Sequence, residues 1–195
     1  MLSDIDILKE MINKQATVQL KEQQDGTRLK YSVTLTEPQH SYSVTIDRMP
    51  KDDKVIVIDV DTYFPAPKKI FTGSKGECKR ADFVIVTNTG TEKIILCLEI
   101  KKRTDSKSTI IKQLTGAQCF VAYCKEIGKA FWNKHNFLDA YQYRFVSIGH
   151  ISISKKKTQS ESSINNNPDS KEIHDCPNRM RIISYSGSLL FDRLI

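Results

Sequence analysis

The chain has 195 residues, of which 39% are apolar and 27% are charged. This composition is typical of a soluble globular protein, and the length suits one compact domain over residues 1–195. The sequence contains no apolar run of about 18 residues, so we expect no membrane span and no membrane partner. A formal net charge of +7 favours polyanionic partners such as nucleic acids, although charge does not decide the fold.

The cysteines and the N-terminal segment indicate the compartment. The five cysteines are odd in number, and no two of them have the C-x-x-C spacing. They are therefore expected to be free thiols in a reducing environment. Residues 1–15 carry several acidic side chains and no long apolar stretch, which does not fit a secretion signal. We expect a cytoplasmic protein.

The N-terminal part of the chain predicts a helix followed by strands. Ser3 is placed to cap the helix, and Glu37–His40 has the composition of a hairpin turn between two alternating strands. Apolar periodicity and turn residues predict these elements in chain order: a helix over 4–14, strands over 28–36, 41–47 and 54–60, and a loop over 61–78 that is rich in Pro, Gly and Lys.

The rest of the chain predicts further strands around one long helix. The turn Asn88–Thr91 separates two strongly apolar strands, and Gly128 is a candidate terminator of the long helix. The expected elements are strands over 80–87 and 93–101, helices over 107–128 and 134–141, strands over 143–154 and 180–185, and a terminal helix over 188–195. Residues 155–178, which are poor in apolar side chains, are predicted to be a mobile loop.

The order of these elements predicts an α/β fold. Residues 83–86 (FVIV) and 94–98 (IILCL) are almost continuously apolar, which indicates strands that are buried on both faces. Such strands are typical of a central mixed β-sheet flanked by helices. We therefore predict a single α/β domain of this architecture.

Charged side chains follow the apolar strands at one end of the predicted hairpin. If the hairpin closes near Gly90, Asp82 lies opposite either Leu98 or Glu99, with directly opposed Cβ atoms about 5 Å apart. Because side chains alternate along a strand, Glu99 and Lys101 share a face. Two carboxylates and one ammonium group are thus predicted to meet there. The alternative is an exposed strand end that carries only a surface salt bridge.

This group of side chains suits a divalent metal. Charged groups at the end of apolar strands are costly unless they are paired or bound to a metal. Two converging carboxylates suit Mg²⁺, which prefers oxygen ligands and keeps several waters, and Mn²⁺ should substitute for it. The metal would polarise a phosphate and activate a water, while Lys101 would orient that water or help to deprotonate it. We therefore predict Asp82, Glu99 and Lys101 as catalytic residues for phosphodiester hydrolysis.

The arrangement resembles the PD-(D/E)xK nucleases of the restriction-endonuclease-like fold. The resemblance rests on Asp82 near a strand start and on Glu99-Ile100-Lys101 at the end of the next strand, followed by a helix and a further strand. Ala81 stands where the family name has proline. The resemblance implies metal binding by Asp82 and Glu99, with the carbonyl of Ile100 as a further ligand. It also implies a nuclease, more often acting on DNA than on RNA.

Further site residues follow from the same resemblance. Many members of the family add an acidic residue. Asp59 and Asp61, which are predicted to share a face at the end of the preceding strand, are both candidates. Each of them could instead cap the following loop. Gln113 in the long helix corresponds to a Gln or Lys that faces the site in several related nucleases. It could equally be a tolerated polar residue at the boundary of the core.

The expected function is metal-dependent cleavage of DNA by an endonuclease of restriction, phage-defence or repair type. A homodimer would let two sites cut both strands of a duplex. One alternative is a non-catalytic, nuclease-like subunit for nucleic-acid binding or assembly. A second is a regulatory protein whose basic clusters only increase solubility. Salt-dependent DNA binding would distinguish the endonuclease and the non-catalytic subunit from the regulatory protein. Metal-dependent turnover would then distinguish the endonuclease from the non-catalytic subunit.

Overall fold

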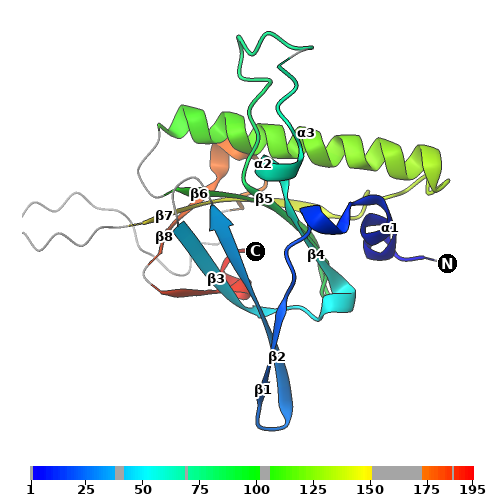
Figure 1. Ribbon diagram of the computed structural model, residues 1–195, viewed down its shortest axis with the longest axis vertical. Helices are drawn as coiled ribbons and strands as arrows, with labels where there is room; N and C mark the ends of the chain where they lie inside the picture. The colour runs from blue at the N-terminus through cyan, green and yellow to red at the C-terminus, as the bar shows by residue number, and fades with distance from the viewer. Residues whose placement is uncertain (1, 38–41, 69, 102–105, 151–172, 186) are drawn as a thin grey trace, which may run out of the picture.

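The computed structural model describes residues 2–37, 42–68, 70–101, 106–150, 173–185 and 187–195 (Figure 1). Its core is a five-stranded sheet whose strands follow one another in chain order. The strands are β4 (Val55–Asp59), β5 (Phe83–Asn88), β6 (Lys93–Lys101), β7 (Gln142–His150) and β8 (Arg181–Tyr185). Pairing is antiparallel from β4 to β6 and parallel from β6 to β8, so the sheet is mixed.

Helices cover one face of this sheet. They are α1 (Asp4–Met11), the short α2 (Val60–Tyr63) and the long α3 (Lys107–Phe131). The crossover from β6 through α3 to β7 is needed because parallel neighbours cannot be joined by a tight turn. Apolar side chains of α1 and α3 pack on Ile56, Val84 and Ile95 to form one core. None of the described helices combines the length and the hydrophobicity that crossing a membrane requires.

A second sheet covers the opposite face. It contains β1 (Lys21–Asp25), β2 (Arg28–Glu37), β3 (Tyr42–Met49) and β9 (Ser188–Leu190), in the order β1-β2-β3-β9. The pairs β1–β2 and β2–β3 are antiparallel, whereas β3 and β9 are parallel, so this sheet is also mixed. Val33 and Leu35 of β2 point inward against Ile85 and Leu96, and they form a second core between the sheets.

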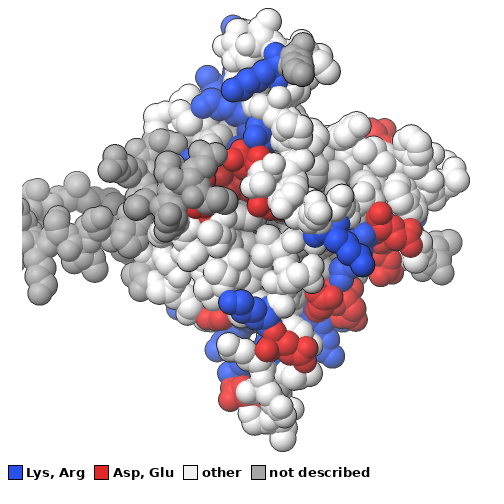
Figure 2. Space-filling view, in the orientation of Figure 1, with Lys and Arg blue, Asp and Glu red and all other residues white. Residues whose placement is uncertain are grey.

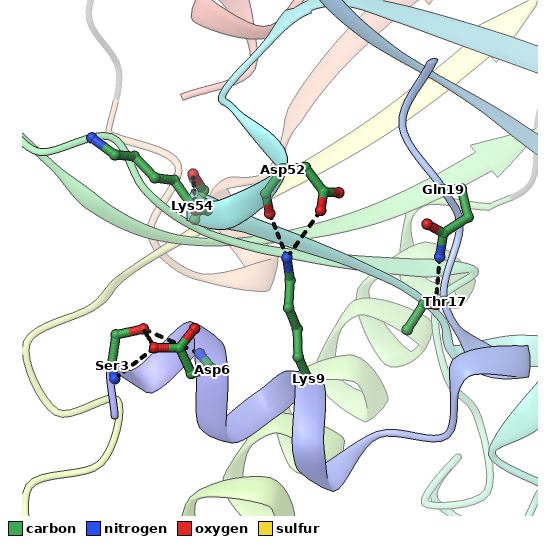
Figure 3. A network of polar contacts seen from close by, with 8 residues as sticks. Ser3, Asp6, Lys9, Thr17, Gln19, Asp52 and Lys54 are labelled. Carbon is green, nitrogen blue, oxygen red and sulfur yellow. Dashed lines mark hydrogen bonds and ion pairs between the residues drawn. The ribbon is translucent and has the colours of Figure 1, made fainter. Parts of the chain in front are cut away.

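Short 3-10 helices and polar contacts join these layers. The 3-10 helices are η1 (Lys14–Ala16), η3 (Asp52–Lys54), η4 (Pro177–Arg179) and η5 (Phe191–Arg193). Ser3 and Asp6 form a reciprocal capping box at the start of α1. Lys9 Nζ then donates to the carbonyl of Asp52 and lies 3.3 Å from its carboxylate (Figure 3). These contacts tie α1 to the segment that leads into β4.

Much of the predicted secondary structure is confirmed. The first helix begins after its predicted cap, and the hairpin of β2 and β3 lies where alternation placed it. The α/β class, the mixed sheet around β5 and β6, and the long helix after them are also present. The strand predicted over residues 54–60 ends at Asp59, because Val60 begins α2.

The covering of the sheet differs from the prediction. Helices lie on one face only, and the N-terminal hairpin contributes to a sheet on the other. Strands with alternating apolar side chains need a cover for one face only, and β2 and β3 find it against β5 and β6. The same requirement explains why the C-terminal helix predicted over 188–195 is wrong. Leu189, Phe191 and Leu194 of this segment fill the core between the sheets as β9 and η5.

Two predictions near the end of α3 are also wrong. The helix continues past Gly128 to Phe131, and residues 135–140 form turns in place of the helix predicted over 134–141. Asn133 and Leu138 have positive φ angles of 52° and 57°, which break helical geometry. A Cβ on Gly128 would lie 2.1 Å from the Phe137 ring, so this glycine permits close packing and does not end the helix.

The mobile loop predicted over 155–178 lies mostly outside the described residues. Its last residues are described, and His174 there is buried. The backbone N–H of Phe145 donates to the carbonyl of His174, and His174 Nε2 lies 3.0 Å from the carbonyl oxygen of Leu194. The segment that precedes β8 is thereby attached to β7 and to the C-terminal segment.

Candidate functional site

Asp82 and Glu99 lie side by side at one end of the five-stranded sheet. In the antiparallel pair of β5 and β6, Phe83 lies opposite Leu98, and the same register one residue further places Asp82 beside Glu99. The structure thus decides between the two partners that the sequence left open. Asp82 and Val84 share a face of the strand, as do Glu99 and Cys97, and that face is covered by the helices.

The carboxylate of Asp82 is held in place by the neighbouring strand. Its Oδ2 atom accepts a hydrogen bond of 2.6 Å from the backbone N–H of Ile100. The Asp82 carbonyl accepts a second bond, of 2.9 Å, from the N–H of Val60 at the start of α2. With only 7% of its surface exposed, Asp82 is both buried and oriented by these contacts. Ile100, whose carbonyl was the implied further ligand, contacts Asp82 through its backbone N–H.

Glu99 is completely buried, with 0% exposure. Its Oε1 atom forms an ion pair of 2.5 Å with Lys101 Nζ, and the Lys101 side chain is 19% exposed. The backbone N–H of Asp82 is near enough to the carboxylate to lower the pKa of Glu99, but Oε2 makes no hydrogen bond of normal geometry within the described part of the chain. A buried carboxylate with one unsatisfied oxygen is costly, which is typical of functional positions. The burial contradicts the alternative of an exposed surface salt bridge.

Burial and mutual repulsion disfavour the ionised forms of both carboxylates. Loss of hydration raises the pKa of Asp82, while the hydrogen bond from Ile100 and the charge of Lys101 oppose that rise. Loss of hydration also raises the pKa of Glu99, and the negative charge of Asp82 adds to the effect. Lys101 lowers the pKa of Glu99, but less than burial raises it. A second positive charge at this position would therefore be strongly favoured.

These raised pKa values predict how stability depends on pH. A carboxyl group whose pKa is higher in the folded than in the unfolded protein keeps its proton on folding, so the free energy of unfolding falls as pH rises. In a metal chelator, the melting temperature should decrease from about pH 5 to about pH 8. Mn²⁺ requires ionised ligands, so the stabilisation that it adds should grow over the same interval. Thermal melts test this, with Glu99→Gln as the control that flattens the slope. A slope unchanged in that variant would contradict the assignment.

Asp59 and Asp61 have different surroundings. Asp59 Oδ1 accepts a hydrogen bond of 3.0 Å from the N–H of Thr62, so it caps α2. Asp61 lies within α2, and its Oδ1 atom is 3.2 Å from a guanidinium nitrogen of Arg80. Its negative charge contributes to the raised pKa of Asp82. The prediction that both aspartates share one face at a strand end is wrong, because the strand stops at Asp59. Asp61 is the one whose charge affects the site.

Gln113 lies beside these residues and not in contact with the buried carboxylates. It lines an open pocket of about 580 Å³ together with Asp61 and Arg80. Its Oε1 atom is buried and has no hydrogen-bond partner among the described residues. Arg80 holds the opposite wall of the pocket in place, because its guanidinium group also donates to the carbonyl of Asp61 at 2.9 and 3.2 Å. Gln113 therefore shares a pocket with Arg80, which comes two residues before Asp82.

The donor set fits a metal that needs few protein ligands. Within the described residues, no three His, Cys, Asp or Glu side chains lie close enough together to hold a metal ion. Mg²⁺ is commonly bound by one or two carboxylates and completes its shell with water and substrate oxygens. Asp82 and Glu99 meet that requirement, and the unsatisfied Oε2 of Glu99 is the oxygen most in need of a cation. In the structure, the ammonium group of Lys101 pairs with the other carboxylate oxygen of Glu99, Oε1.

Comparisons with known proteins add no assignment. The chain matches no protein-family model, no curated protein and no solved structure.

Two features of the site were missed by sequence reasoning. Gly116 in α3 allows the helix to contact the backbone that leads into Asp82, since a Cβ there would lie 1.8 Å from the Lys79 carbonyl oxygen. An isolated glycine within a helical pattern was the available signal. The second is Glu37 at the end of β2, whose charge also raises the pKa of Asp82. The sequence does not indicate that Glu37 lies near Asp82, because β2 belongs to the other sheet.

Proposed function

We propose that this protein is a metal-dependent nuclease with its active site at Asp82, Glu99 and Lys101. The observation that carries the proposal is the pairing of two buried carboxylates on adjacent strands, with a lysine ammonium group 2.5 Å from one of them. A structural ion pair needs one carboxylate for one ammonium group. The second buried carboxylate adds a negative charge whose cost is offset when a divalent cation binds.

Each residue has a separate task in this proposal. Asp82 and Glu99 would hold Mg²⁺, or Mn²⁺ in its place. When bound, the metal supplies the charge that polarises a phosphodiester and makes a water molecule more acidic. Asp82 is already oriented by the N–H of Ile100, so its ligand geometry is set before binding. Lys101 would move from Glu99 to the water and the phosphate, where it orients the water and offsets negative charge.

The fold supports the same proposal. In this α/β domain the acidic residues follow one another on antiparallel strands and a crossover helix comes next, an order that resembles the restriction-endonuclease-like fold. We therefore propose membership of the PD-(D/E)xK nucleases and DNA, before RNA, as the substrate. The net charge of +7 supports a polyanionic substrate. A homodimer would allow both strands of a duplex to be cut.

A nicking assay with a ligand variant tests this function. Purified protein should convert supercoiled plasmid to nicked forms in Mg²⁺ or Mn²⁺ and not in a chelator. Glu99→Gln should lose that activity, and calorimetry should show weaker Mn²⁺ binding, because an amide is a poorer ligand for a hard cation than a carboxylate. Its melting temperature in chelator should be preserved, since the amide keeps the shape of the side chain and does not need to ionise.

The choice of substrates and controls makes the assay decisive. Linear duplex, single-stranded DNA and RNA should be tested in parallel, because the proposal favours duplex DNA. Lys93→Ala is a matched control at the opposite, exposed end of β6, and it should cleave like the wild type. Salt-dependent DNA binding without any metal-dependent turnover would replace the nuclease with a non-catalytic binding subunit. Absence of both would refute a role in nucleic-acid metabolism.

A further inference from the structure

The loop between α2 and β5 stands out from the body of the protein, beyond α3 (Figure 1). It is described at residues 64–68 and 70–80. Midway along the loop in sequence, Ile70 is 80% exposed and Phe71 is 50% exposed, and we call these two residues the tip. Ile70 is the most exposed large apolar side chain in the described part of the chain. Neighbouring apolar side chains exposed on a projecting loop have no structural use, so they point to a ligand.

Hydrogen bonds within the described part of the loop restrict its conformation. Both carboxylate oxygens of Glu77 accept bonds of 2.9 Å from backbone N–H groups, one from Gly73 and the other from Lys75. At the tip, the N–H of Phe71 donates to the carbonyl of Pro67 at 2.9 Å. These bonds order the loop during folding, so less conformational entropy is lost when a ligand binds. They also occupy the carboxylate of Glu77.

The loop is basic along its length (Figure 2). Lys68, Lys79 and Arg80 line the open pocket of about 580 Å³ between the loop and α3. The acidic side chain in its lining is Asp61, which is already paired with Arg80. Figure 2 shows basic side chains along the projecting loop and an acidic patch at its base. The pocket therefore attracts a polyanion and leaves Lys68 and Lys79 to meet it.

The pocket adjoins the segment that carries Asp82. Arg80 comes two residues before Asp82, and the backbone N–H of Asp61, which also lines the pocket, donates to the carbonyl of Asp82 at 3.3 Å. A phosphodiester at Asp82 and Glu99 would thus have its neighbouring phosphates beside the lysines. The apolar tip would then lie further along the same polymer. An anionic membrane would also suit lysines beside apolar side chains, but it would not explain the connection to the carboxylates.

We propose that this loop is a wedge for duplex DNA, in which Ile70 and Phe71 enter between base pairs while Lys68 and Lys79 hold the phosphates beside them. Apolar side chains that enter base steps in this way unstack them and bend the duplex. The lysines add the salt-dependent part of the affinity. This inference rests on the proposed nuclease function and assigns its substrate as a duplex that is deformed on binding.

The test uses the full chain in a chelator, where binding is measured without cleavage. The probe is a short labelled duplex with 2-aminopurine, a base whose fluorescence rises when it is unstacked. Wild-type protein should bind and raise that fluorescence. Ile70→Ser/Phe71→Ser should bind about ten-fold more weakly and abolish the rise, since stacking contributes about 1–3 kcal/mol per base. Lys68→Ala/Lys79→Ala should lower the salt dependence of log affinity by about two, because each lysine that neutralises a phosphate contributes close to one.

A matched surface variant and a competing ligand complete the design. Phe131→Ser removes an exposed aromatic side chain at the far end of α3 and should leave affinity and fluorescence unchanged. All variants should melt as the wild type does. Wild-type affinity and fluorescence in the tip variant would overturn the wedge, even if the protein cuts DNA. Tip-dependent binding to anionic lipid vesicles in place of duplex would overturn it as well. Tip-dependent unstacking without cleavage would uphold the wedge and refute the nuclease.

Discussion

Lys101→Ala is expected to lower metal-dependent cleavage by about 10²–10⁴-fold, the usual contribution of a positioned proton-transfer group. In the proposed mechanism Lys101 acts on the water and phosphate and is not a metal ligand, so Mn²⁺ binding should survive. In the wild type, the ammonium group of Lys101 lies 2.5 Å from Glu99 and lowers the pKa of that carboxyl. The variant removes this ammonium group. The pKa of Glu99 should therefore rise further, and metal binding should shift to higher pH.

Three measurements separate these effects. Plasmid nicking gives the loss of activity, and calorimetry with Mn²⁺ at several pH values gives the shift in metal binding. Thermal melts in a chelator should show a steeper fall of stability with rising pH than in the wild type, because an unpaired buried carboxylate must stay protonated. Lys93→Ala on the same strand serves as the control. Cleavage at the wild-type rate by Lys101→Ala would disprove the mechanism, whatever the fold of the protein.

Gly116→Ala is expected to destabilise the protein by about 3 kcal/mol, although alanine normally strengthens a helix. The added Cβ would lie 1.8 Å from the carbonyl oxygen of Lys79 and 2.9 Å from Cα of Arg80. Both are backbone atoms, so no side chain can rotate away. Either α3 or the segment before Asp82 must move, and the variant should lose Mn²⁺ affinity together with stability.

Chemical denaturation with Thr115→Ala as the matched control tests this expectation. Thr115 is the preceding residue of the same helix and its side chain is exposed, so alanine there should change stability by less than about 1 kcal/mol. A pronounced difference between the two variants would show that the contact of α3 with residues 79–80 matters. If Gly116→Ala were as stable as the wild type, that contact would not position the site.

The elements predicted correctly from sequence are those whose local pattern and tertiary environment agree. The long helix α3, which buries Ile110, Leu114 and Val121, and the turn around Gly90 are such cases. Residues 188–195 were predicted wrongly because their apolar side chains fit a helix, whereas their parallel pairing with β3 depends on a strand far away in sequence. The exposed strand β1 was missed for a related reason, since polar residues form a strand there by pairing with β2.

The candidate site divides in the same way. The sequence predicted that Asp82, Glu99 and Lys101 lie at the same end of a hairpin closed near Gly90, and alternation predicted that Glu99 and Lys101 share a face. The structure supplied the register that places Asp82 opposite Glu99 and not opposite Leu98. Only the tertiary structure decided that Glu99 is fully buried and that both carboxyl pKa values are raised. Burial depends on α3 and the second sheet, which cover these strands from both sides. Charge and hydration at a site are set by everything packed around it, and a local pattern does not contain that information.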